Sequence, residues 1–173
     1  MRRVVSCLCV MVLGADALSL PQVVLAARES APQLSQMTKE QKEQEQKYFR
    51  AHSLGFARIF SRYHPGPYWI LHHRKEFRLT AGQVQAETRL KLGMARSTIE
   101  GNRRLMAAYK AYATDAAAAN PSLAKIHSDI EAVGRAQTWL AGEMVPYHLK
   151  SYALLTAQQK QIYHRLVLKR LRR

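Results

Sequence analysis

Apolar residues recur at steps of three and four along most of the chain, which is the spacing of one face of an α-helix. A first helix is predicted over residues 38–62, where Phe49, Phe56, Phe60 and Tyr63 would form one apolar stripe. Two prolines and a glycine follow directly and cannot continue a helix. No run of alternating β-branched residues is long enough to predict a sheet.

The pattern continues with two long helices. A short amphipathic piece is predicted over residues 67–77, and the first long helix over residues 80–119. Asn120 is expected to cap the second long helix, with Pro121 at its first helical position. Because the link between them is short, residues 80–119 and 122–154 are expected to pack as an antiparallel hairpin.

The second long helix has the most regular pattern in the chain. Its apolar positions follow heptad-like steps, so we expect Val133 and Leu140 to be buried in the hairpin seam. Pro146 lies late in this seam and is expected to kink the helix. Thr156 opens a last helix that carries Ile162, Leu166 and Val167. The seam consists of Leu123, Ile126, Ile130, Val133, Gln137, Leu140, Met144 and Tyr147.

Three predicted helix starts share a short phrase: an apolar residue, then Thr, then Gln three positions later. The Thr hydroxyl can accept a hydrogen bond from the first helical turn, while the Gln side chain reaches back to the Thr N–H, which closes a capping box. A looser copy begins at Met37, and the two strong copies lie 155 − 79 = 76 residues apart. The strong copies supply the capping residues Leu79, Thr80, Gln83, Leu155, Thr156 and Gln159.

The N-terminus resembles a secretory signal. Arg2 and Arg3 precede an apolar run over residues 4–14, and small residues follow it. The run is too short to span a membrane, so we interpret residues 1–27 as a cleaved signal peptide, with cleavage after Ala17 or after Ala26/Ala27. Residues 28–173 are then expected to form a single all-α domain.

Charge and cysteine content narrow the chemistry further. Cys7 and Cys9 both lie in the predicted signal, so the mature chain is expected to contain no disulfide and no thiolate site. The net charge of +15 becomes 25 − 11 = +14 after removal of residues 1–27. A surface this basic favours anionic partners, and export makes nucleic acid an unexpected one. The C-terminal bases are Lys160, Arg165, Lys169, Arg170, Arg172 and Arg173.

The paired phrase Leu79-Thr80-Ala81-Gly82-Gln83 and Leu155-Thr156-Ala157-Gln158-Gln159 resembles the LTxxQ motifs of the Spy/CpxP family of periplasmic proteins. The resemblance covers roughly residues 71–165, and residues 136–166 are also similar to periplasmic heavy-metal sensors of the CnrX type. The predicted helices together give an all-α fold, a long antiparallel helical hairpin with shorter flanking helices, which would be extended and curved. Such a thin fold buries little apolar surface alone, and the resemblance implies a homodimer.

Basic and apolar side chains alternate along the first long helix. Arg and Lys stems can cover apolar surface while their charged heads stay in water, and Met adapts to varied contacts. Such a face would suit unfolded or acidic protein segments, although the same apolar residues would also serve as hairpin core. The candidate client-binding residues are Arg89, Lys91, Met94, Arg96, Arg103, Arg104, Met106 and Lys110.

Metal binding and catalysis find less support in the sequence. His72 is a weak candidate ligand, and Met144 and His148 are four positions apart on one predicted helix. None of them has partners at the spacing of a zinc site, so no metal or other cofactor is predicted. No nucleophile elbow, phosphate loop or zinc-protease motif is present, so an enzyme is not expected.

These observations favour a periplasmic, ATP-independent chaperone or envelope-stress protein that binds unfolded or partly folded proteins. Two alternatives remain open: a periplasmic heavy-metal sensing or resistance protein, and an interaction protein that docks on an envelope stress sensor. An anionic membrane surface is a further partner that the C-terminal charge suggests.

Overall fold

The computed structural model describes residues 34–53 and 55–172, which belong to the compact unit Ala31–Arg173. The predicted signal peptide lies outside the described residues. Every regular element in the described part is a helix, and the two longest pack together, so the prediction of this all-α architecture is confirmed. The helices are α1 (Lys39–His52), α2 (Phe56–Tyr63), α3 (Pro67–His72), α4 (Arg74–Phe77), α5 (Ala81–Ala116), α6 (Leu123–Ala153) and α7 (Ala157–Leu171).

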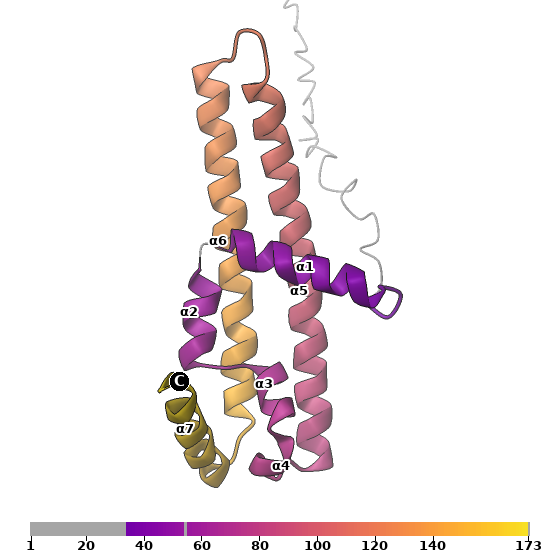
Figure 1. The fold of residues 1–173 in the computed structure, drawn as a ribbon, viewed down its shortest axis with the longest axis vertical. Helices are drawn as coiled ribbons and strands as arrows, with labels where there is room; N and C mark the ends of the chain where they lie inside the picture. The colour runs from indigo at the N-terminus through magenta and orange to yellow at the C-terminus, as the bar shows by residue number, and fades with distance from the viewer. Residues whose placement is uncertain (1–33, 54, 173) are drawn as a thin grey trace, which may run out of the picture. The chain divides into compact units, whose positions relative to one another are not determined.

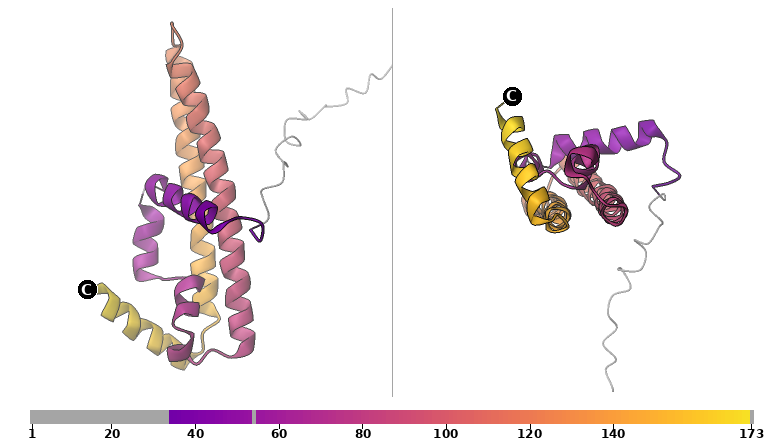
Figure 2. Two further views of the ribbon diagram at one scale, coloured as in Figure 1. Left: turned by 45° about the vertical axis from the view of Figure 1, so that its right-hand side comes forward. Right: turned by 90° about the horizontal axis from the view of Figure 1, so that it is seen from below.

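α5 and α6 lie side by side along their length (Figures 1 and 2). Contacts between them run in opposite directions: Gln137 donates to the Tyr109 hydroxyl at 3.3 Å, and Ser151 donates to Glu87 at the other end. The short link over residues 117–122 turns the chain back on itself. The two helices therefore form an antiparallel pair, hereafter the hairpin.

The short helices pack on the hairpin. α1 and α3 contact α5, and α2 and α3 contact α6, while α7 contacts α2 and α4 (Figure 2). Two buried clusters result. The first consists of Ile70, Phe77, Leu155, Tyr163 and Val167. The second consists of Leu105, Val133 and Leu140, with Tyr48 and Phe49 of α1 packed against it.

Polar side chains fix the short helices to the hairpin. Asn102 is fully buried on α5 and donates to the Glu45 carbonyl at 2.9 Å. Gln137 of α6 donates to the His52 carbonyl at the end of α1, at 3.2 Å. Both bonds are accepted by backbone carbonyls of α1. These hydrogen bonds therefore fix the position of α1 on the hairpin, in addition to its apolar contacts.

The proline-rich turn between α2 and α3 is held by two buried side chains. His148 Nδ1 donates to the His64 carbonyl at 2.7 Å, and the Tyr163 hydroxyl donates to the Pro65 carbonyl at 2.9 Å. A Cβ at Gly66 would lie 2.7 Å from His148 Nδ1, so only glycine allows this close approach. α6 and α7 thereby both bind this turn.

The predicted helix over residues 38–62 is wrong as a single element. The chain forms α1 and then α2, with Gly55 between them at φ 77°. Glycine adopts this left-handed conformation without the strain that a Cβ would add, and the helix axis changes there. As a result Phe49 packs against α5 and α6, whereas Phe56 and Tyr63 are exposed.

The start of α6 also differs from the prediction. Neither Asn120 nor Pro121 belongs to the helix, which begins at Leu123 after Ser122 in the N-cap position. The expected seam is buried at Val133, Leu140 and Met144, but Leu123 is 83 % exposed and Ile130 is also exposed. The two apolar clusters do not reach the turn end of α6, where the contact to α5 is polar: Lys125 of α6 pairs with Asp115 of α5.

Candidate functional site

The Thr–Gln phrases are helix starts, as predicted. Thr80 and Thr156 are N-caps of α5 and α7, and Thr38 caps α1 in the same way. The Thr80 N–H donates to Gln83 Oε1 at 3.1 Å, and the Gln83 N–H donates to Thr80 Oγ1 at 3.2 Å. All three boxes are complete, so these residues stabilise helix ends.

The structure adds a connection between the two strong phrases. Gln83 Nε2 donates to Gln159 Oε1 at 2.7 Å, and Gln159 Nε2 donates to Gln83 Oε1 at 3.0 Å. Each amide also donates to a backbone carbonyl, of Leu154 for Gln83 and of Phe77 for Gln159. The repeated phrase thus joins the start of α5 to the start of α7. The identical spacing of the two phrases was the only sign of this pairing in the sequence.

The predicted client-binding residues do not form one surface. Lys91 and Met94 are half-buried and lie on other sides of α5. Arg104 stacks on the Trp139 ring of α6, with its guanidinium carbon 4.2 Å from the ring centroid. Arg104 and Arg103 also pair with Glu100, so Arg104 partly serves to hold the hairpin together.

The other basic residues of the set share a single side of α5. Arg89, Arg96, Arg103 and Lys110 are exposed and follow one another at seven-residue steps, over about 32 Å of helix at 1.5 Å per residue. Leu92, Ile99 and Met106 fall between them at steps of three and four, and Leu92 and Met106 are exposed. We call these seven residues the basic–apolar stripe.

The stripe lies away from the core. Leu105 is fully buried, and it follows Arg103 by two residues, which is about 200° around a helix. An apolar 3–4 pattern normally marks a packed seam, yet here cations occupy every second position of the pattern. The candidate set predicted from the sequence contained the four basic residues and Met106 but neither Leu92 nor Ile99, although the 3–4 spacing could have identified both.

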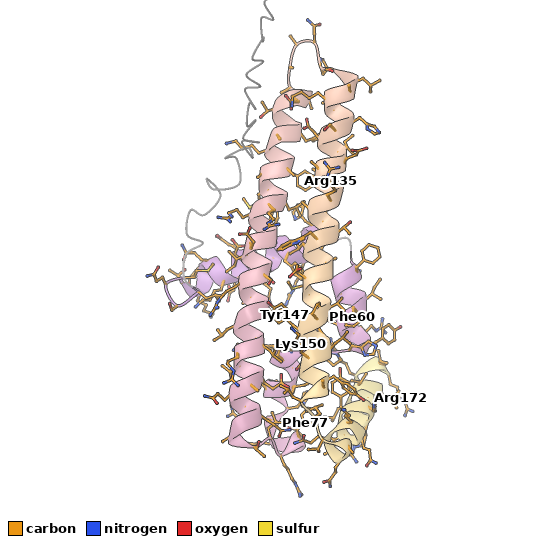
Figure 3. The ribbon with its side chains drawn as sticks, turned by 180° about the vertical axis from the view of Figure 1, so that it is seen from behind. Phe60, Phe77, Arg135, Tyr147, Lys150 and Arg172 are labelled. Carbon is orange, nitrogen blue, oxygen red and sulfur yellow. The ribbon has the colours of Figure 1, made fainter. Side chains whose placement is uncertain are left out.

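A shallow groove adjoins one end of the stripe. Tyr147 of α6 lies against Gly93 of α5, where a Cβ would come within 2.8 Å of its ring, and its hydroxyl is 3.0 Å from Ser97 Oγ. Tyr147 and Lys150 lie on the face of the hairpin seen in Figure 3. The groove has a volume of about 440 Å³ and is lined by Ala86, Arg89, Leu90, Tyr147, Lys150, Ala153 and Leu154.

The weak metal candidates have other roles. Met144 and His148 are both buried on α6, where Met144 Sδ accepts from Thr98 at 3.3 Å and His148 holds the proline-rich turn. His72 is exposed on α3. Among residues 34–53 and 55–172 there is no group of three or more His, Cys, Asp or Glu side chains that could hold a metal ion.

Glu87 and His148 are two of the buried groups that have shifted pKa values. Burial raises the pKa of the Glu87 carboxyl to about 7, against the lowering effect of the Ser151 hydroxyl that donates to it. Burial lowers the pKa of the His148 imidazole, although its bond to the His64 carbonyl acts in the opposite direction. Both groups are buried and hydrogen-bonded across the fold, so their pKa shifts make stability depend on pH.

The chain matches no protein-family model, and no curated protein and no solved structure resembles it closely enough to count as a match. Within the described helices, none is both long and apolar enough to cross a membrane. The basis for a function is therefore the site itself and the motif resemblance in the sequence.

Proposed function

We propose that the protein is a periplasmic, ATP-independent chaperone of the Spy/CpxP type that binds unfolded or partly folded proteins in envelope stress. The basic–apolar stripe carries this proposal. It offers cations and adaptable apolar groups together on an exposed helix side, and an unfolded acidic segment can use both. The groove beside Tyr147 extends the same chemistry onto α6.

We also propose that the protein works as a homodimer, as the family resemblance implies. The stripes of two copies would not pair with each other, because the four cations of one stripe would face the four cations of the other and repel them. A dimer formed elsewhere would leave both stripes accessible to clients. Analytical ultracentrifugation tests this arrangement. The wild type and the stripe variants should all sediment with the mass of a dimer.

An aggregation assay tests the chaperone function. Wild type should suppress light scattering by a denatured, acidic test protein, with and without chelator. The Leu92→Ser/Met106→Ser variant removes two exposed apolar groups of the stripe and should suppress less, with unchanged thermal melting. Arg96→Gln should weaken suppression most at low salt, because exposed charges are screened within about 10 Å at 0.1 M ionic strength.

A matched control uses exposed apolar residues outside the stripe. Leu123→Ser/Ile130→Ser changes α6 near the hairpin turn and should suppress as well as wild type. Equal loss in both double variants would remove the stripe from the mechanism. Suppression that needs a metal would favour the heavy-metal sensor, and a chain that suppresses nothing but binds an envelope sensor domain would favour the docking protein.

A further inference from the structure

α2 leaves its apolar side uncovered. Phe56, Ile59 and Tyr63 follow each other at steps of three and four, so they share one face, and they are 63, 58 and 52 % exposed. On the edge of this face Phe60 packs edge-on against His148, with the ring centroids 5.8 Å apart. The helix is thus attached through one side while three large apolar groups face outward.

α7 lies next to α2 and presents cations. Arg170 donates to the Ser61 carbonyl of α2 at 3.3 Å, which joins the two helices. Tyr163 and Val167 are buried, and the opposite side of α7 is open. That outer side carries Arg165, Leu168, Lys169 and Arg172, and it is exposed at all four residues.

The charge on these two helices has one sign. α2 contains two arginines and α7 four lysines and arginines, with Arg172 directly after it, and neither helix contains an acidic residue. In the described part of the chain, none of the ion pairs involves Arg165, Lys169 or Arg172. A second copy that docked here through the same surface would oppose these cations with its own.

We propose that the exposed apolar face of α2 and the basic outer face of α7 together dock the protein on an anionic lipid bilayer. An interfacial helix needs an apolar face with aromatic groups and a polar face with cations, and α2 has both. Bases on α7 would add electrostatic attraction to the lipid head groups beside it. This surface is separate from the stripe on α5, so the inference stands independently of the chaperone function.

Shape and charge together favour a lipid bilayer as the partner of this surface. The apolar groups share one face of α2, and the cations Arg165, Lys169 and Arg172 line an open surface of the neighbouring α7 together with Leu168. A folded protein partner would need a complementary surface of opposite charge, whereas a fluid anionic bilayer supplies both an apolar interior and head-group charge to any such surface.

Vesicle co-sedimentation tests the proposal with the chain from Arg28 on, which contains the whole compact unit Ala31–Arg173. The wild type should bind vesicles in which about one third of the lipid is phosphatidylglycerol and the rest phosphatidylcholine. It should bind pure phosphatidylcholine vesicles much less. Phe56→Ser/Ile59→Ser should weaken binding on the order of tenfold through lost apolar insertion. Arg165→Gln/Lys169→Gln should weaken it about fivefold per charge at low salt.

The control is Leu123→Ser/Ile130→Ser, which removes exposed apolar groups of similar size from α6 and should bind vesicles like the wild type. Circular dichroism and thermal melting of each variant establish that it is folded. The proposal would be overturned if the wild type did not bind the anionic vesicles. It would also be overturned if the Phe56→Ser/Ile59→Ser variant bound them as strongly as the wild type. So would a sedimentation result in which the α2 variant loses a dimer while its vesicle binding is unchanged, because the α2 face would then be a contact between copies.

Discussion

The side-chain amides of Gln83 and Gln159 each satisfy all their hydrogen-bonding groups. Each oxygen accepts from its own cap Thr N–H and from the other amide, and each nitrogen donates to the other amide and to a backbone carbonyl. Gln159 is buried. Removing one glutamine therefore leaves the other with unpaired groups in a partly buried place, which is costly.

Replacing these glutamines by alanine should show strong coupling. Gln83→Ala and Gln159→Ala should each lower the free energy of unfolding by about 1–3 kcal/mol. The double variant should cost less than the sum, by about 0.5–3 kcal/mol, because the shared bonds can be lost only once. Denaturant unfolding of the four proteins in the cycle measures this.

Gln41 provides the control for that cycle. It closes the capping box of α1 in the same way but has no amide partner in the structure's described hydrogen bonds. Gln41→Ala combined with Gln83→Ala should therefore be additive. Additivity in the Gln83/Gln159 cycle as well would show that the amide pair contributes nothing.

At the scale of the helices, the hairpin depends on where backbones come close. A Cβ on Gly101 of α5 would lie 2.3 Å from Leu140 Cδ1 and 3.1 Å from Trp139 Cζ3. Gly134 of α6 has nothing within 4 Å of the same position. One glycine is thus required by packing and the other only weakens its helix.

Alanine substitution should have opposite effects at these two glycines. Gly101→Ala should lower the free energy of unfolding by about 1–3 kcal/mol, because the added methyl overpacks a buried contact. Gly134→Ala should raise it by about 0.5–1 kcal/mol through better helix propensity. Thermal and urea unfolding measure both, and a stabilising Gly101→Ala would mean that the hairpin is less closely packed there.

The sequence predicted these elements where local signals sufficed. Thr80 and Thr156 mark their helices through short-range hydrogen bonds, and the heptad pattern correctly placed Val133 and Leu140 in the core. The break at Gly55 was not predicted, because an amphipathic pattern that continues across a glycine does not reveal its left-handed φ.

The candidate site was only partly predictable for a different reason. Composition identified the cations of α5 but could not tell which side of the helix faces the core. Burial of Leu105 and Glu87 decides this, and it removes Lys91 and Met94 from the stripe. The sequence placed the exposed face of α2 in one apolar stripe with Phe49, because a sequence pattern shows which residues share a face and not whether anything covers it.

For the whole molecule, two buried groups make opposite contributions to the dependence of stability on pH. The folded-state pKa of Glu87, about 7, is above its ordinary 4.5, so its contribution is full below pH 4.5 and is lost as pH rises to 7. The folded-state pKa of His148 is lowered from 6.5, so its contribution is present above pH 6.5 and is lost on acidification. The two contributions offset each other in mildly acidic solution.

Glu87→Gln removes one of these two titrating groups and should leave the contribution of His148 to the pH dependence of stability. Relative to wild type, the variant should gain up to about 3 kcal/mol of unfolding free energy between pH 4.5 and 7, and nothing more above pH 7. The free energy of unfolding of the variant should fall as pH drops below about 6.5, because the contribution of His148 is lost there and Glu87 no longer offsets the loss. Urea unfolding across this range, with the exposed Glu43→Gln as control, measures both effects. A constant difference between variant and wild type would show that Glu87 does not titrate abnormally.

The amide pair also has a consequence for the order of folding. Gln83 and Gln159 are 76 residues apart, and bringing them together first would close a long, flexible loop at an entropic cost. Once the residues between them have formed the antiparallel pair of α5 and α6, the two glutamines are already close and the entropic cost of joining them is small. We therefore expect the start of α7 to be completed late in folding, after α5 and α6 have paired.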